Sequence, residues 1–435
     1  MSDKLQITRE YILSGIENGE LAEGEKLPAA RELAEAVGVS LPIAQMAFMS
    51  LTRDGILSSI PRQGTYVRHD WRDRILPGSF RAFRPIWEDI IRDTVAKEFP
   101  DIRICRRFSE GIFEIRFTMD AQNRQEHYLD LNDLFHEACP NQDEFFLAPF
   151  QGFRTPGGKL FGIPLTFSPW VIAYNPEIIQ EAGGDQPSTG WSWEDFIHLV
   201  RVLRRRYEGH EIINFLPYPS FWMNFIFRAG GSVIAKSADG FQVNLDSPQT
   251  LEGLNKVKEL YRELGSPRET CDFVKKFFHG ELAMLVTTRE DIDFNSEMCW
   301  KCISLPFMPG GADLVAQATD LLCVQRLANN LDQVRGLLRL LLSEEVQEKL
   351  GRARYGIPIR KTSAIRTFSE EDPRDKLFCS EMTKISARYN FGSYELSRLI
   401  VSGLNRIWYE DANIAGTAKE IAAALRTILR YHAID

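Results

Sequence analysis

Apolar residues recur at helical spacing in two segments close to the N-terminus. Residues 4–18 predict a helix that ends at Asn18-Gly19. Its apolar stripe is formed by Leu5, Ile7, Tyr11, Ile12 and Ile16. Residues 29–37 predict a second helix, which stops before Gly38.

A third helix is predicted over residues 42–55, with Ser40 as its N-cap and Pro42 near its first turn. Its buried face should contain Ala44, Ala47, Phe48 and Leu51. The short glycine-containing connection at 37–40 is typical of a helix-turn-helix. Residues 56–59 and 64–67 then predict two short strands around a turn at 61–63, which would form a wing.

From residue 79 onward the pattern changes to strands that alternate with amphipathic helices. Residues 103–108 and 283–286 predict strands, and residues 193–206 and 250–264 predict helices. Ser192 with Asp195 three residues later forms a capping-box pattern. This alternation indicates an α/β fold, and the charged, Pro-Gly segment at 71–78 suits a linker.

Length and charge refine this picture. A chain of 435 residues gives a prior of about three domains. Its 52 basic and 60 acidic residues leave a net charge of −8, which argues against extensive contact with nucleic acid but allows one small basic surface. Residues 1–70 alone contain seven basic and ten acidic residues, so this segment has a net charge of −3.

The sequence shows no catalytic or metal-binding pattern, so we expect no enzyme activity, cofactor or metal. Cys299 and Cys302 lack a second pair for zinc, and the seven histidines have no ligand spacing. The seven scattered cysteines indicate reduced thiols. No run of eighteen apolar residues and no N-terminal signal pattern is present, so we expect a cytoplasmic protein without membrane association.

Motifs in residues 5–67 resemble the winged helix of GntR-type regulators. They are Leu27-Pro28-Ala29-Ala30-Arg31-Glu32-Leu33-Ala34, Gly38-Val39-Ser40, Leu51-Thr52-Arg53-Asp54-Gly55-Ile56-Leu57 and Gly64-Thr65-Tyr66-Val67. The resemblance implies operator DNA as partner, with the third helix in the major groove and the wing at the minor groove. The DNA-contacting positions that it implies are Lys26, Arg31, Ser40, Gln45, Arg62, Gln63, Gly64 and Thr65.

This winged helix departs from the family pattern at two positions. The family usually has basic residues directly after the hydroxyl residue and four positions later, where this chain has Leu41 and Gln45. Phosphate neutralisation supplies much of the affinity for DNA. With a net charge of −3, we therefore expect weak, salt-sensitive binding that requires a homodimer on a two-fold site.

The rest of the chain resembles family 1 solute-binding proteins, the two-lobed receptors of sugar importers. The motifs occur in the family's order over nearly all of residues 79–435. They are Leu160-Phe161-Gly162-Ile163-Pro164, Val171-Ile172-Ala173-Tyr174-Asn175-Pro176, Gly190-Trp191-Ser192-Trp193-Glu194-Asp195-Phe196, Trp222-Met223-Asn224-Phe225-Ile226, Phe277-Phe278-His279-Gly280-Glu281-Leu282-Ala283-Met284 and Leu305-Pro306-Phe307-Met308-Pro309-Gly310-Gly311.

The two resemblances together imply a multidomain fold. A winged helix-turn-helix (α with a small β wing) at 1–70 and a linker at 71–78 precede a two-lobed α/β, periplasmic-binding-protein-like (type II) sensor at 79–435. Lobe I would comprise 79–168 and 314–352, and lobe II 169–313 and 355–435, with crossings near Pro169 and at 311–317. A ligand between the lobes would close them.

A sugar site should combine aromatic rings, which stack on C–H faces, with paired polar groups for hydroxyls. Candidates occur where the resemblance places the interlobe cleft. They are Arg81, Ser109, Glu110, Ser168, Trp170, Tyr218, Trp222, Asn224, Thr319, Asp320, Tyr389 and Phe391.

The sequence therefore predicts a transcriptional regulator of the GntR family that responds to a small-molecule effector, most plausibly a sugar. The alternative is a cytoplasmic solute-binding or scaffold protein in which the winged helix serves dimerisation. Leu41, Gln45 and the local charge of −3 favour the alternative.

Overall fold

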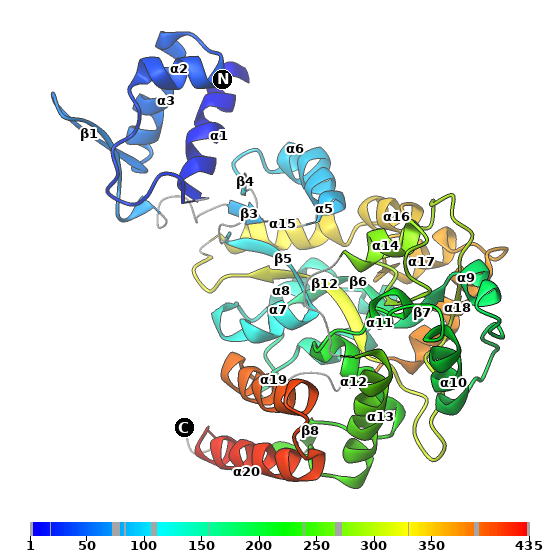
Figure 1. Cartoon of the computed structure of the whole chain (residues 1–435). Helices are drawn as coiled ribbons and strands as arrows, with labels where there is room; N and C mark the ends of the chain where they lie inside the picture. The colour runs from blue at the N-terminus through cyan, green and yellow to red at the C-terminus, as the bar shows by residue number, and fades with distance from the viewer. Residues whose placement is uncertain are drawn as a thin grey trace. The chain divides into compact units, whose positions relative to one another are not determined.

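The computed structural model describes residues 3–17, 19–71, 79–81, 84–105, 111–155, 157–237, 240–265, 272–328, 330–386 and 391–432. The chain divides into two compact units. Figure 1 labels the helices and strands that are described below. Unit 1 contains Met1–Arg116, His127–Leu129 and Leu322–Leu340, and unit 2 contains Phe117–Glu126, Asp130–Leu321 and Leu341–Asp435. The predicted linker lies at 71–78, of which 72–78 are outside the described residues.

Unit 1 begins with three helices and a hairpin, as the sequence predicts. The helices are α1 (Asp3–Glu17), α2 (Ala30–Val37) and α3 (Leu41–Arg53), and the hairpin is formed by β1 (Leu57–Ile60) and β2 (Gly64–Val67). Gly38 ends α2 in the left-handed conformation at φ 72°, and Val39 N donates to Ala34 O. Glycine adopts this conformation without the steric cost of a Cβ atom, so it makes the tight turn between α2 and α3 possible.

Burial corrects the predicted stripe of α1. Leu5, Ile12 and Ile16 are buried, but Ile7 and Tyr11 are 57% and 53% exposed. On α3, Ala44, Ala47 and Leu51 are fully buried as predicted, and Phe48 is partly buried. Ile7 and Tyr11 are four residues apart and therefore lie on the same face of α1, next to the face that packs into the core.

The remaining elements of unit 1 belong to an α/β arrangement. They are β3 (Ser79–Arg81), α5 (Pro85–Ile90), the π-helix η1 (Ile91–Val95), α6 (Ala96–Glu98), β4 (Arg103–Cys105), β5 (Phe113–Phe117) and α15 (Leu331–Leu341). β3 pairs in parallel with both β4 and β5. Strand β4 covers the first half of the segment predicted as a strand at 103–108, and 106–108 lie outside the described residues.

Unit 2 contains strands of two different sheets. β6 (Ile163–Pro169) and β13 (Ile357–Pro358) are antiparallel, and β12 (Gln317–Val324) lies beside β6. A second sheet has the order β10-β7-β11, formed by Met284–Thr287, Val171–Tyr174 and Lys301–Ile303. β8 (Ile234–Ser237) and β9 (Gly240–Val243) form a separate hairpin. The chain passes from one sheet to the other between Pro169 and Val171, which agrees with the predicted crossing near Pro169.

Helices account for most of the remaining residues in unit 2. They are α7 (Thr118–Asn123), η2 (Gln125–His127), α8 (Asn132–Ala138), η3 (Gln142–Glu144), η4 (Ala148–Phe153), α9 (Pro176–Glu181), α10 (Trp193–Leu203), α11 (Gly209–Ile212), α12 (Pro219–Arg228), α13 (Pro248–Leu264), α14 (Phe273–Phe278), α16 (Glu344–Arg352), α17 (Lys361–Thr367), α18 (Pro373–Glu381), η5 (Met382–Lys384), α19 (Tyr394–Tyr409) and α20 (Ile414–His432). The capping box at α10 is confirmed, because Ser192 N donates to Asp195 at 2.8 Å and Asp195 N donates to Ser192 at 3.1 Å.

The predicted boundaries of the two lobes remain a prediction. Strand β13 pairs Ile357 with Phe167 of β6, so it lies in the sheet assigned to lobe I. This pairing falls within the segment from 355 onward that the sequence analysis assigns to lobe II. Two residues that pair with a distant strand give no recognisable pattern in the sequence.

Helices α12 and α13 pack closely through Gly253. A Cβ atom on Gly253 would lie 2.6 Å from Cα of Ile226. We therefore expect Gly253→Ala to push the helices apart and destabilise the protein by about 1–3 kcal/mol. Thermal unfolding followed by circular dichroism would measure this change, with Asn255→Ala on the exposed side of α13 as the control. An unchanged unfolding temperature for Gly253→Ala would contradict the close approach.

Candidate functional sites

The turn between α2 and α3 displays two of the predicted DNA-contacting residues. Arg31 is exposed in the first turn of α2, and Ser40 is exposed at the N-cap of α3. Ser40 has the extended backbone of an N-cap, but its hydroxyl makes no capping hydrogen bond. The hydroxyl is therefore available to an external partner. Gln45 is exposed one turn further along α3.

The β1–β2 hairpin forms the wing and carries the other predicted residues. Arg62 lies in its turn with a left-handed φ of 65°, an uncommon conformation for a residue with a side chain. Lys26 pairs with Tyr66 of β2, and Leu27 N donates to Thr65 O at 2.8 Å. A Cβ atom on Gly64 would lie 2.5 Å from Cε of Lys26. Glycine at this position, beside the turn of the hairpin, lets the Lys26 side chain lie against the wing.

Ion pairs divide the basic residues of the winged helix into two groups. Arg9 donates to Asp54 at 2.7 Å, Arg68 binds Asp70 at the same distance, and Arg53 pairs with Asp54 at 3.7 Å. Lys26, Arg31 and Arg62 have no ion pair among the described residues. Their charges are consequently not neutralised within the domain, although its net charge is −3.

The first predicted solute-binding residues lie where the chain leaves β6. Ser168 is fully buried, and its Oγ accepts from Arg289 N at 2.9 Å. Trp170 is 7% exposed, and its ring centroid lies 5.3 Å from that of Phe221. Trp170 Nε1 is buried without a hydrogen-bond acceptor among the described residues. An unsatisfied buried N–H is costly, so this atom is a donor that a bound hydroxyl could satisfy.

Helix α12 places three further predicted residues, with different exposure. Tyr218 precedes the helix and is 40% exposed, whereas Trp222 is fully buried and nearly parallel to Phe391 at 6.2 Å. The Asn224 amide donates to Ser220 O at 2.8 Å and accepts from Ala316 N at 2.7 Å. In this conformation the side chains of Trp222 and Asn224 make packing and hydrogen-bonding contacts within the protein, and that of Tyr218 is exposed to solvent.

The start of β12 brings polar residues from separate elements together. Thr319 O accepts from Thr118 Oγ1 at 3.4 Å, and Gln317 donates to Thr319 Oγ1. Asp320 accepts a hydrogen bond from Tyr355, so its carboxylate is engaged. Gln125 donates to Gly392 O, next to Phe391.

Sequence reasoning missed three of these residues, namely Thr118, Gln125 and Gln317. The Oε1 atoms of both glutamines are buried without a partner among the described residues. Single polar residues beside apolar strands carry no sequence signal that distinguishes a ligand contact from a structural contact. The predicted residues Ser109, Glu110 and Tyr389 lie outside the described residues, as does the side chain of Arg81.

Three cavities in unit 2 have other linings. One of about 680 Å³ is lined by residues of α13 and the α19–α20 connection, including Lys258 and Asp411, whose side chains pair at 2.6 Å. A second cavity, of about 540 Å³, is lined by residues that include Tyr394 and Arg406. A third, of about 340 Å³, is lined by residues that include His210 and Tyr261. None of the predicted solute-binding residues that the structure describes lines these cavities.

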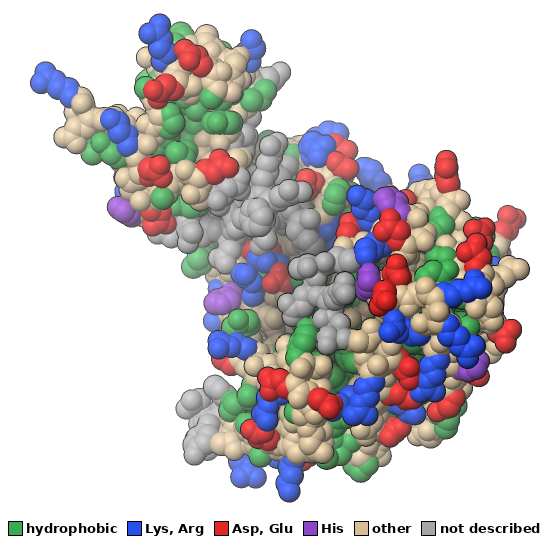
Figure 2. All heavy atoms as spheres, in the orientation of Figure 1, with side chains coloured by type: hydrophobic (Ala, Val, Ile, Leu, Met, Phe, Trp, Pro, Cys, Tyr) green, Lys and Arg blue, Asp and Glu red, His purple; other side chains and the backbone are tan. Residues whose placement is uncertain are grey.

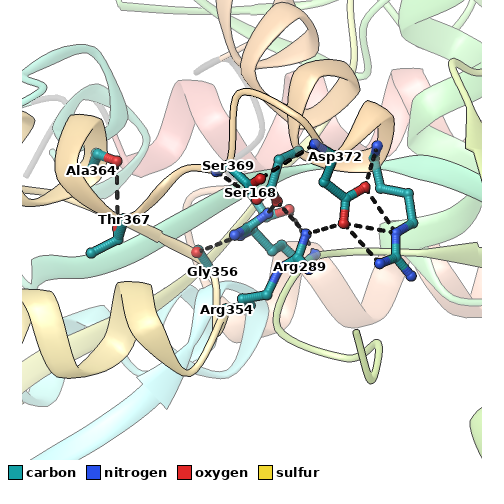
Figure 3. A network of polar contacts seen from close by, with 10 residues as sticks. Ser168, Arg289, Arg354, Gly356, Ala364, Thr367, Ser369 and Asp372 are labelled. Carbon is teal, nitrogen blue, oxygen red and sulfur yellow. Dashed lines mark hydrogen bonds and ion pairs between the residues drawn. The ribbon is translucent and has the colours of Figure 1, made fainter. Parts of the chain in front are cut away.

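A buried arginine cluster lies next to the crossing (Figure 3). The Arg289 guanidinium is 1% exposed, donates through Nε to Gly356 O at 2.9 Å and pairs with Asp375. Burial lowers the pKa of Arg289, and the hydrogen bond and charge of Asp375 oppose this shift. Arg354 and Arg374 both bind Asp372 at 2.7 Å. The hydrogen bond from Arg374, followed by that from Arg354, holds the pKa of Asp372 below its ordinary value.

Aromatic rings complete the surroundings of these arginines. The Arg289 guanidinium lies 4.7 Å from the rings of Phe294 and Phe368, and Arg354 lies 4.0 Å from Phe294. Because Ser168 lies near the end of β6 in one sheet and Arg289 follows β10 of the other, this cluster connects the two sheets at the crossing. Arg289-Glu290-Asp291 has the composition of a solvated turn, so the sequence did not indicate the cluster.

The geometry and composition of the described residues bear on whether they include a metal site or a membrane-spanning helix. In the part of the chain that the structure describes, no group of three or more His, Cys, Asp or Glu residues could hold a metal ion. No single described helix is long and apolar enough to cross a membrane; α2 and α3 taken together meet that criterion, but they are bent by 112°.

Comparison with known families identifies the class of protein. Residues 6–67 match the bacterial regulatory proteins of the gntR family. Residues 126–374, more than half of the chain, match the family of bacterial extracellular solute-binding proteins, and the chain belongs to that family. It therefore combines a GntR-type DNA-binding regulator domain with a solute-binding domain. Both families are non-enzymatic.

Individual relatives agree with this assignment. The HTH-type transcriptional repressor YtrA of Bacillus subtilis is 27% identical over 89 residues, which cover 20% of this chain and 65% of that protein. UgpB from Mycobacterium tuberculosis in complex with glycerophosphocholine has a TM-score of 0.67 at 16% identity, covering 82% of this chain and 99% of that one. Maltose-bound MalE3 from T. maritima has a TM-score of 0.66 at 13% identity, covering 81% and 99%. The predicted fold class is thereby confirmed: an N-terminal winged helix is followed by a two-lobed periplasmic-binding-protein fold.

The arginine cluster generates a stability prediction. Asp375→Ala leaves the Arg289 guanidinium buried without its carboxylate, which should destabilise the protein by about 3–5 kcal/mol. Thermal unfolding of the full chain would measure the effect. The control is Asp332→Ala, which removes an exposed partner of Arg335 and should leave the unfolding temperature unchanged. Equal effects of the two substitutions would contradict a structural role for the cluster.

Proposed function

We propose that this protein is a cytoplasmic transcriptional regulator that binds operator DNA as a homodimer and responds to a small carbohydrate. The observation that carries the proposal is the presence, in one chain, of a GntR-type winged helix and a solute-binding domain. A solute receptor joined to a DNA-binding domain gives a solute direct influence on DNA binding. The cytoplasmic location follows from the need to reach the chromosome.

The winged helix supports DNA binding through its unpaired cations. Arg31, Lys26 and Arg62 lie at the start of α2 and on the wing, the positions where the GntR resemblance implies contact with DNA. Each can neutralise a phosphate without first breaking an ion pair within the described chain. Three such contacts per domain are few, so a dimer on two half-sites would supply the affinity.

The solute-binding domain supports a carbohydrate as effector. Trp170 and Tyr218 provide rings near the crossing, and the free Nε1 of Trp170 provides a hydrogen-bond donor. Rings combined with polar groups suit the C–H faces and hydroxyls of sugars. Among the solved structures of similar fold, one has maltose bound and another α-D-tagatose.

Coupling between solute and DNA would depend on the crossing segments. Asn224 fixes Ala316 just before β12, and Arg289 fixes Ser168 at the end of β6. A solute shifts the conformation only by its differential affinity for the two states. Contacts with the crossing would give it that difference, and the resulting movement would change the arrangement of the dimer.

The DNA-binding part predicts a specific response to salt. Arg31→Ala and Arg62→Ala should each weaken binding of upstream duplex fragments and reduce the slope of log affinity against log salt by about 0.9 per lost phosphate contact. Fluorescence anisotropy at several salt concentrations would measure this.

Arg205→Ala is the matched control, because Arg205 is exposed and lies outside the winged helix. If the protein bound none of the upstream fragments at low salt, the proposal would be contradicted. In that case the winged helix would be assigned to dimerisation.

The solute-binding part predicts stabilisation by a sugar. Among maltose, tagatose, mannotriose and glycerophosphocholine, a true ligand at a hundred times its dissociation constant should stabilise the folded protein by about 2.7 kcal/mol. Thermal-shift measurements would detect it. Tyr218→Ala and Trp170→Phe should reduce the shift, whereas Tyr394→Ala, which removes an exposed ring on α19, should not. Stabilisation by glycerophosphocholine alone would contradict a carbohydrate effector.

A further inference from the structure

The exposed face of α3 is unusually apolar. Leu41, Met46 and Met49 are 41%, 53% and 72% exposed, and Gln45 is exposed between them. At about 100° per residue these four side chains fall within one arc of the helix. The buried residues Ala44, Ala47 and Leu51 occupy the other side.

This arc contains no negative charge. Helix α3 has no Asp or Glu, although residues 1–70 contain ten acidic residues. Its only charged residue is Arg53 in the last turn, whose side chain is 79% exposed and lies 3.7 Å from the carboxylate of Asp54, the C-cap residue of α3. On the face drawn in Figure 2, hydrophobic side chains are visible over the N-terminal helices, and Lys and Arg side chains at the tip of the hairpin.

Cations therefore frame the apolar face. Arg53 lies at the C-terminal end of α3, Arg31 lies on the preceding helix α2, and Arg62 lies on the wing. A protein partner with an acidic surface would contact only the cations, and a partner with an apolar surface would contact only the apolar face of α3. The DNA major groove does, because it has phosphates on both edges and base edges at its floor.

The chemistry of the base edges then indicates which bases this face suits. Arg and Lys recognise guanine through O6 and N7, and α3 has neither at positions 41 and 45. Apolar side chains contact the C5-methyl group of thymine, and glutamine pairs with N6 and N7 of adenine. We propose that α3 recognises A·T base pairs, with Leu41, Met46 and Met49 against thymine methyl groups and Gln45 on adenine.

This inference rests on the proposed DNA binding and gives that site its sequence preference. It also accounts for an acidic domain that binds DNA. Methyl contacts are insensitive to net charge, so part of the affinity comes from apolar burial rather than from phosphate neutralisation. The acidic residues of the domain lie outside α3, and Asp54, which directly follows the helix, pairs with Arg9 at 2.7 Å and with Arg53 at 3.7 Å.

Thymine-to-uracil substitution tests the inference, because it removes only the C5-methyl group. The full-length protein selects duplexes from a random pool at low salt, and the selected site is resynthesised with uracil in place of each thymine. Each contacted methyl should contribute about fourfold in affinity, the factor that corresponds to one buried methylene-sized group. In Met49→Ala and Leu41→Ala, the affinities for the thymine and uracil forms should become more nearly equal.

Ile7→Ala is the matched control, because it removes an exposed apolar side chain from α1 of the same domain and should retain the full thymine preference. Selection of A·T-rich sites with a methyl dependence that Met49→Ala reduces would support the inference. Selection of G·C-rich sites, or equal affinity for thymine and uracil forms, would overturn it while DNA binding stands. Retention of no duplex at low salt would overturn both this inference and the proposed function.

Discussion

The connection between the two sheets of the solute-binding domain depends on one buried cation. Arg289 follows β10 of the three-stranded sheet, but its backbone N–H donates to Ser168 at the end of β6, and its side chain donates to Gly356 O and pairs with Asp375. A guanidinium that is 1% exposed is stable only when its donors are satisfied and its charge is balanced. These requirements fix the segments before β13 and around α18 relative to the crossing.

The same constraint supports the proposed coupling between solute and DNA through the crossing. Ser168 and Ala316 are each held by a residue that is distant in sequence, Arg289 and Asn224 respectively. Discrete hydrogen-bonded arrangements of this kind allow a small displacement to produce a change between states rather than a gradual deformation. Trp170 lies beside Ser168 with a donor that remains available to a solute. The proposed effector would therefore act at the point where the two sheets are joined.

In the winged helix, the important constraint is the distribution of charge over the surface of the domain. Its acidic and basic residues are distributed so that Arg9 and Arg68 stabilise the domain through ion pairs, while Arg31 and Arg62 remain exposed. The net charge of −3 therefore describes the domain as a whole and not the surface of α3. Separation of charge between surfaces allows an acidic chain to present a local surface that suits DNA.

The sequence alone determined the elements and the class of protein. Helical periodicity, Gly38 and the Gly64 motif predicted α2, α3 and the wing within one or two residues, because local backbone preferences and amphipathic spacing act over short distances. Only the tertiary structure decided which residues face inward. Ile7 and Tyr11 fall on the exposed side of α1, Trp222 and Asn224 are buried in structural contacts, and β13 joins β6 across about 190 residues. The Arg289 cluster was equally unpredictable, because a charged turn and a buried ion-pair network have the same composition. They differ only in the segments that pack around them, and those segments are distant in the chain.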